Sequence, residues 1–90
     1  MSAADAPREP SGEIVEDLRR EIVRLSEGKL TTEEIDPGEH LFDCGYVDSL
    51  SAVMLLAYIE DRYGVLIEDV ELIESLTSLD RIAAHVAQSR

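Results

Sequence analysis

A serine with an acidic neighbour lies where a long loop is expected to become a helix. Ser49 follows Asp48, whose carboxylate is a good N-cap for a helix that begins there. A serine at the first position of a helix points outward, so another enzyme can reach its hydroxyl. The helix N-terminus also favours an anionic group, through its N–H groups and the helix dipole. These features make Ser49 accessible and suited to an anionic group, but the triplet Asp-Ser-Leu alone does not specify its chemistry.

The other residues that could do chemistry form no recognisable catalytic or metal-binding arrangement. No Gly-x-Ser-x-Gly elbow surrounds Ser49, and nothing places His40 or His85 beside it as a base. The cysteine and histidine spacing fits no zinc site, and the aspartates near the serine do not fit a calcium loop. Cys44 has Asp43 as its charged neighbour, which disfavours a thiolate, so we expect a packed or idle cysteine. A small serine hydrolase is therefore a remote hypothesis.

The charge of the chain indicates the chemistry of its partners. The formal net charge is −12, from 20 acidic against 8 basic residues. This balance argues against direct binding of nucleic acid or of an anionic membrane surface, and a basic protein surface is its natural complement. Residues 27–76 contain thirteen of the acids and only two bases. Because Ser49 lies in this stretch, we expect a partner-facing surface there. An acidic helical module that only binds a basic partner is the second hypothesis.

Length and composition predict a single small domain. The chain has 90 residues and one cysteine, so no internal disulfide can hold the fold. The N-terminus lacks the basic and apolar regions of a secretory signal, and no segment approaches the roughly 20 apolar residues that cross a bilayer. We therefore expect a cytoplasmic protein. Residues 1–11 are predicted to be a disordered tail and residues 12–90 the folded domain.

An amphipathic helix of about four turns is predicted between Ser11 and Gly28. Its apolar residues recur at helical spacing: Ile14, Val15, Leu18, Ile22, Val23 and Leu25. Residues 29–48 have no long helical period and contain the turn signal Asp36-Pro37-Gly38. Apolar residues that could pin this stretch to the core are Leu30, Ile35, Leu41 and Phe42. Tyr46 could line the route to Ser49 or touch a bound group, but we favour a loop anchor.

Three further helices complete an all-α, four-helix prediction. The helix from Asp48 to Gly64 has a predicted apolar face made of Ala52, Val53, Leu56, Ile59 and Tyr63. Residues 65–67 are interpreted as a buried connector. Residues 68–75 would form a short helix with Val70 and Ile73 directed inward. The last helix follows Thr77, with its apolar face at Leu79, Ile82, Ala83 and Val86.

With these elements, the sequence from about Ile14 to Val86 resembles the acyl and peptidyl carrier protein family. The matching motifs are the aromatic-x-x-Gly approach at residues 42–45, Asp-Ser-Leu at 48–50, Tyr-Gly-Val at 63–65 and Thr-Ser-Leu at 77–79. The resemblance implies a four-helix bundle of acyl-carrier type. It also implies that Ser49 receives 4′-phosphopantetheine from coenzyme A, attached by a partner transferase that uses magnesium, with Asp48 and Leu50 flanking the site. Such a protein is a carrier without catalytic activity.

The spacing within the motif bears on the subtype. Two residues separate Gly45 from Asp48, where fatty-acid-type carriers usually have one. Peptidyl carriers of modular synthetases usually have two adjacent glycines before the serine, and here there is one. The pattern is more similar to discrete carriers for D-alanine, other small amino acids or unusual malonyl-type extender units. We therefore expect a discrete carrier of a small acyl or aminoacyl thioester in a specialised-metabolite pathway.

The helix after Ser49 suggests a surface for partner enzymes. Leu50, Met54 and Ala57 lie on a face offset from the core stripe, and an exposed methionine packs adaptably on a partner. The candidates for an acidic rim around them are Glu60, Asp61, Glu68, Asp69 and Glu71. Alternatively, Leu50 and Met54 close the core against the loop. The expected partners are a phosphopantetheinyl transferase, an adenylating or acyltransferase loading enzyme, and downstream acyl-accepting enzymes with basic or mixed basic-apolar surfaces.

Overall fold

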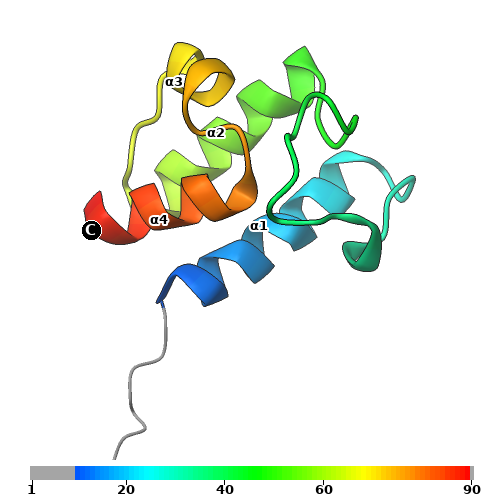
Figure 1. Cartoon of the computed structure of the whole chain (residues 1–90), viewed down its shortest axis with the longest axis horizontal. Helices are drawn as coiled ribbons and strands as arrows, with labels where there is room; N and C mark the ends of the chain where they lie inside the picture. The colour runs from blue at the N-terminus through cyan, green and yellow to red at the C-terminus, as the bar shows by residue number, and fades with distance from the viewer. Residues whose placement is uncertain (1–9, 90) are drawn as a thin grey trace, which may run out of the picture.

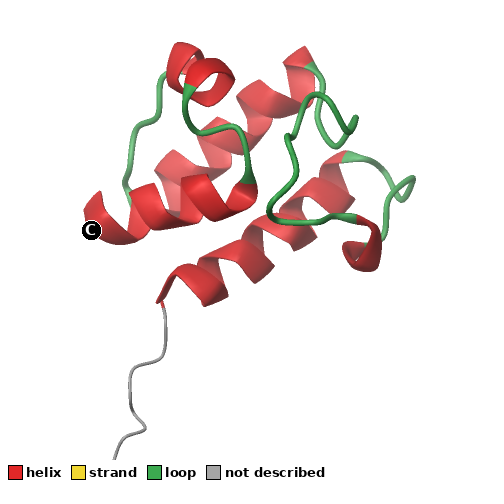
Figure 2. Cartoon of the chain, viewed as in Figure 1, coloured by secondary structure: helices red, strands yellow, loops and turns green. Residues whose placement is uncertain are grey.

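The computed structural model describes residues 10–89, and the regular elements in this range are all helices (Figure 2). The elements in chain order are α1 (Pro10–Leu25), the 3₁₀-helix η2 (Thr32–Glu34), α2 (Ser49–Tyr63), α3 (Asp69–Glu74) and α4 (Leu79–Ser89). Three helices are long and α3 is short. The predicted all-α, four-helix architecture of acyl-carrier type is confirmed.

Helix α1 begins earlier than the sequence suggested. It includes Pro10 and Ser11, which the prediction had assigned to the tail. Proline is tolerated in the first turn of a helix because its missing N–H has no intrahelical acceptor there. The rest of the predicted tail, residues 1–9, lies outside the described residues.

The core is aliphatic and lies where α1 packs against α4 and α2 (Figure 1). The predicted stripe of α1 is buried at Ile14, Val15, Leu18 and Ile22, while Val23 and Leu25 are half-buried at its edge. The predicted face of α4 is fully inside: Leu79, Ile82, Ala83 and Val86. These two helices therefore follow their sequence periodicity closely.

The interior face of α2 differs in part from the prediction. Ala52 and Ile59 are buried as predicted, but the centre of the face is Leu55, which is fully buried. Val53, predicted to face inward, is 58% exposed. Leu56 and Tyr63 are half-buried. Apolar residues occur on nearly every side of this helix, so spacing alone did not select the face that packs.

The prediction for α3 was wrong in its orientation. Val70 and Ile73 were expected inside, but they are 52% and 58% exposed, and Leu72 is the buried residue. A helix of six residues has too few positions to define a period, and its contact with α2 selects Leu72. The connector before it is extended, so Val65 and Ile67 are buried while Leu66 between them is exposed.

The long loop between α1 and α2 is packed onto the helices. Ile35 and Leu41 are fully buried, and Leu30 and Phe42 pack against the core, as predicted. The N–H of Leu41 donates to the carbonyl oxygen of Thr77 over 2.8 Å, which ties the loop to the start of α4.

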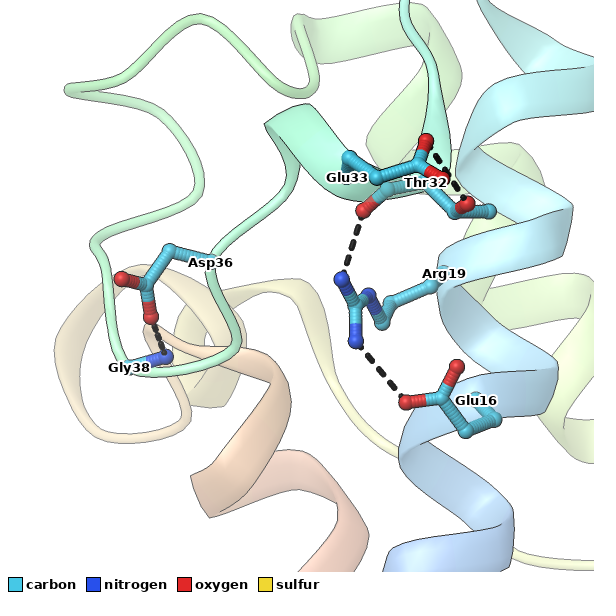
Figure 3. Close-up of polar contacts among 6 residues, drawn as sticks. All are labelled: Glu16, Arg19, Thr32, Glu33, Asp36 and Gly38. Atoms are coloured by element: carbon cyan, nitrogen blue, oxygen red, sulfur yellow. Dashed lines mark hydrogen bonds and ion pairs between the residues drawn. The ribbon is translucent and has the colours of Figure 1, made fainter.

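Arg19 ties the same loop to α1, and a further hydrogen bond forms within the loop (Figure 3). The Arg19 guanidinium donates to the carbonyl oxygen of Thr32 at 2.6 Å and to the Glu16 carboxylate at 2.8 Å. At the predicted turn, the N–H of Gly38 donates to the Asp36 carboxylate at 2.9 Å. The loop that leads to Ser49 is therefore held at several points before α2 begins.

Candidate functional site

Ser49 is the first residue of α2, and it is exposed. The N-cap Asp48 precedes it in extended backbone, and its carboxylate accepts the N–H of Ser51 at 2.9 Å. In return, the N–H of Asp48 donates to the Ser51 hydroxyl oxygen at 2.8 Å. This reciprocal capping uses Asp48 and Ser51 and does not involve the Ser49 side chain. Within residues 10–89, no hydrogen bond engages the Ser49 hydroxyl.

The cap also fixes the charge beside the serine. Hydrogen bonds from the N–H and hydroxyl of Ser51 hold the pKa of Asp48 below its usual value. Asp48 is therefore ionised at neutral pH and stays in place as the cap. The helix N-terminus offsets this charge for a phosphate at the neighbouring position, because the helix dipole favours anions there.

A tight turn brings the chain to this N-terminus. Gly45 has a φ of 75°, a left-handed conformation that a residue with a Cβ rarely adopts. The N–H of the next residue, Tyr46, donates to the carbonyl oxygen of Leu41 at 2.9 Å, and Val47 is buried. The Tyr46 hydroxyl oxygen accepts the N–H of Asp36 at 3.1 Å, and its ring packs against the core. Tyr46 thus anchors the loop, as we favoured from the sequence.

A groove of about 430 Å³ opens next to Ser49, between the end of α1 and the start of α2. Leu50, Ser51 and Met54 form its α2 side. The opposite side comes from residues 24–30, at and after the end of α1, and Tyr46 also contributes. Sequence analysis did not find this groove, because three segments that are distant in the chain form it together. Tyr46 is accordingly both a loop anchor and part of the groove wall.

The predicted partner surface lies on the outside of α2 and α3. Leu50 is 70% exposed and Met54 is 45% exposed, so neither is sealed in the core. Ala57 and four of the acidic residues are also exposed: Glu60, Asp61, Glu68 and Asp69. Glu71 is only half-buried, and its carboxylate accepts the N–H of Glu68 at 3.0 Å as part of the α3 cap. It has less freedom than the other four to meet a partner.

The sequence analysis missed part of this apolar surface. Val53, Leu66, Val70 and Ile73 are exposed as well, and all four had been placed in the core or in a buried connector. The signal that could have found them is the abundance of large aliphatic residues between positions 50 and 76, which exceeds what one face of α2 and the short α3 can bury.

The cysteine and the two histidines do not form a catalytic arrangement. Cys44 is exposed, not packed; partial desolvation and the nearby Glu39 carboxylate raise the pKa of its thiol, which opposes reactivity. His40 lies in the loop, where its Nδ1 accepts the N–H of Asp43, and His85 is half-buried on α4. No group of histidine, cysteine and acidic side chains in the described part of the chain could hold a metal ion.

The site therefore fits the attachment of a group by another enzyme and does not resemble a catalytic centre. An unengaged hydroxyl stands at a helix N-terminus that a fixed loop positions, and exposed apolar and acidic residues lie further along the same helix. These features define a helical carrier domain that presents a covalently attached group to partner proteins.

Comparison with known proteins gives the family. Residues 14–86 match the family described as "Phosphopantetheine attachment site". Over 73 residues the chain is 38% identical to an acyl carrier protein of Streptomyces coelicolor, a match that covers 81% of this chain and 78% of the relative. The chain belongs to the phosphopantetheine-attachment family of acyl carrier proteins.

Membership of this family carries several consequences. The protein is a carrier and not an enzyme, and its prosthetic group is covalently attached 4′-phosphopantetheine. Its partners include a phosphopantetheinyl transferase and acyl-handling enzymes. Among the described helices, none is long and apolar enough to span a membrane.

Proposed function

We propose that Ser49 is the attachment point of the phosphopantetheine arm, and that the arm carries a small acyl or aminoacyl group as a thioester. The observation that carries the proposal is the exposed, unengaged hydroxyl at the first residue of α2. Ser51 lies two residues further along, but its hydroxyl is occupied with Asp48. Of the two serines in the first turn, only Ser49 offers a hydroxyl with no other role.

The attachment reaction is a phosphoryl-type transfer at Ser49. The Ser49 oxygen attacks the phosphorus that bears pantetheine in coenzyme A, and a new O–P bond forms. The bond from that phosphorus to the oxygen of the leaving 3′,5′-ADP breaks, and the serine proton passes to a base on the transferase. When bound, the arm supplies a terminal thiol that holds the acyl group as a thioester. The protein itself contributes the position of the hydroxyl and a helix N-terminus that favours the phosphodiester.

The partner surface in this proposal has an apolar centre and an acidic rim. Leu50, Met54 and Ala57 form the centre on α2. The rim consists of Glu60, Asp61, Glu68, Asp69 and, to a lesser degree, Glu71. A loading enzyme, whether adenylating or acyl-transferring, and a downstream acyl-accepting enzyme would meet it with basic or mixed basic-apolar surfaces. Charge complementarity of this kind accelerates encounter and selects partners more than it adds affinity.

The motif spacing supports the cargo and the pathway in this proposal. Two residues separate Gly45 from Asp48, as in the carriers of small amino acids or unusual extender units that the sequence resembles. This supports a specialised-metabolite role over bulk fatty-acid synthesis.

The test is co-expression with a promiscuous phosphopantetheinyl transferase, followed by intact mass measurement. We expect the wild-type chain and Ser51→Ala to gain the mass of one arm, and Ser49→Ala to gain none. Ser51→Ala is the matched control, because it removes a hydroxyl from the same helical turn. An arm on Ser49→Ala, or its absence from the wild-type chain, would contradict the proposal.

A further inference from the structure

The groove beside Ser49 differs in charge from the surface around it. Residues 27–76 carry thirteen acids and two bases, yet one of these bases, Lys29, lines the groove together with Arg24 from the end of α1. Two acids also line it, Glu27 and Asp48, so the formal charges of the lining balance. The groove is therefore a locally neutral opening in a strongly acidic part of the molecule.

The two cations of the groove are not equivalent. Arg24 is committed to Glu21 through two hydrogen bonds, one from Nε at 3.0 Å and one from a terminal nitrogen. Lys29 is exposed, and its side-chain ammonium forms no hydrogen bond or ion pair with any residue between positions 10 and 89. Of the two acids, Asp48 is held by its capping contacts with Ser51, whereas Glu27 is exposed and its side chain forms no hydrogen bond or ion pair within residues 10–89. Lys29 is thus the groove cation that is available to a ligand.

Apolar side chains line the same groove as this cation. Leu25 and Leu30 contribute from the α1 side, Leu50 and Met54 from α2, and Tyr46 from the loop. A short hydrocarbon segment suits such walls, and an ammonium group on a flexible stem reaches an anion as a point charge. The combination fits a short chain that ends in a carboxylate.

We propose that this groove receives the acyl end of the arm, and that Lys29 favours acyl groups with a terminal carboxylate, such as the half-thioester of a short dicarboxylic acid. The inference rests on attachment of the arm at Ser49. Because a tether gives its free end a high effective concentration near its own anchor, a weak charge pair is enough to bias the occupancy of the groove. An aminoacyl group carries a positive amine, which Lys29 repels.

The experiment loads one protein with three cargos. A promiscuous transferase attaches the malonyl, propionyl or β-alanyl arm directly from the corresponding coenzyme A thioester, and intact mass confirms each product. Amide NMR spectra and thioester hydrolysis rates are then measured for the wild-type chain, Lys29→Gln and Arg20→Gln. Arg20 is exposed on α1 and is absent from the groove lining, so its variant controls for the loss of one positive charge.

We expect the malonyl arm to shift amide signals of residues 25–30 and 46–54 more than the propionyl or β-alanyl arm does. An exposed charge pair is worth up to about 1 kcal/mol, so malonyl hydrolysis should be about two- to fivefold slower than in Lys29→Gln. Arg20→Gln should behave as the wild-type chain, and high salt should remove the difference.

The outcomes separate the two proposals. If the mass shows no arm on Ser49, the proposed function fails before the groove is tested. If all three arms are attached but the malonyl arm moves no groove signals, or Lys29→Gln and the wild-type chain behave alike, attachment stands and the groove proposal is overturned. Stronger shifts with the β-alanyl arm than with the malonyl arm would also overturn it.

Discussion

The two ends of helix α2 are held in opposite ways. At its C-terminal end, the Asp17 carboxylate of α1 accepts hydrogen bonds from the Tyr58 hydroxyl at 2.7 Å, from Arg62 Nε at 3.0 Å and from the Tyr63 hydroxyl. Gly64 then ends the helix in the left-handed conformation. At the N-terminal end, the hydrogen bonds that hold the first turn are local ones between Asp48 and Ser51.

The contacts that stabilise α2 and the residues proposed to serve its function therefore lie at different places along the helix. The Asp17 network and the buried residues in the middle of α2 fix its position against α1. The first turn is then free to present Ser49 and the exposed Leu50 and Met54 to other proteins. Substitutions at the two ends of α2 should therefore have separable consequences, one on unfolding and the other on partner chemistry.

The largest expected effect on stability is at the centre of α2. Leu55 is fully buried, so Leu55→Ala should lower the free energy of unfolding by about 2–5 kcal/mol through lost burial and a residual cavity. Leu50→Ala, the same substitution at a 70% exposed position next to Ser49, is the control. It should leave stability within about 0.5 kcal/mol of the wild-type chain. Urea unfolding followed by circular dichroism measures both.

Equal losses of stability in the two leucine variants would contradict the proposed division of α2. Treating the same samples with the transferase compares the rate of arm attachment in the two variants. Leu50→Ala should then slow attachment of the arm, while Leu55→Ala, where it remains folded, should not.

The next effect is at the Asp17 network. Asp17→Asn keeps the shape of the side chain but removes its charge and one of its strong acceptors, and should cost about 1–3 kcal/mol. Asp61→Asn makes the same change at an exposed position of α2 and should cost far less. If the two variants are equally stable, the network does not hold the C-terminal end of α2.

The pH dependence of the Asp17 effect has a defined sign. Burial acts to raise the pKa of Asp17, but hydrogen bonds from Tyr58, Tyr63 and Arg62 outweigh it and lower the pKa. The carboxylate in turn raises the pKa of Tyr58 to about 12. Because its pKa is lower in the folded state, the Asp17 carboxylate contributes stability at pH values above its unfolded pKa of about 4. This contribution is lost as the pH falls through the folded pKa. The stability gap between the wild-type chain and Asp17→Asn should therefore shrink below about pH 4.

The difference in stability between the wild-type chain and Asp17→Asn separates the effect of Asp17 from that of the other carboxylates. Acid also relieves repulsion among the many other carboxylates, and this affects both proteins alike. A gap that stays constant from neutral pH to strong acid would show that the Asp17 charge does not stabilise the fold.

The smallest expected effect is at the N-cap of α2. Asp48→Ala removes the acceptor for the Ser51 N–H, so the first turn should fray and the melting temperature should fall slightly. Asp48→Asn keeps an acceptor and should restore most of the loss. Amide hydrogen exchange at Ser51 and Ala52 reports this directly, with Gly64 at the other end as an unchanged reference. Fraying at both ends of α2 would contradict independent anchoring.

Much of the fold could be predicted from the sequence where the pattern was unambiguous. Helices α1 and α4 each have one apolar stripe and a polar remainder, so their spacing predicted the buried residues correctly. The loop anchors Ile35 and Leu41 were predicted as well, because the stretch around them is otherwise largely polar. The same reasoning placed Ser49 at the first position of a helix.

The pattern was ambiguous in α2 and α3, and there the prediction was less accurate. Val53, Val70 and Ile73 are as apolar as the residues that are buried, so composition did not distinguish them from Leu55 and Leu72. What selected the inner face was the packing of α2 on α1 and of α3 on α2. The apolar residues left over became an exposed surface.

By itself, the sequence determined the four helices, the acidic character of the middle of the chain and the serine at the head of α2, because each depends on local periodicity, capping or composition. Only the tertiary structure decided the groove beside Ser49 and the Asp17 network at the far end of α2. Both join residues that lie far apart in the chain, and their contacts depend on how the helices pack rather than on local sequence.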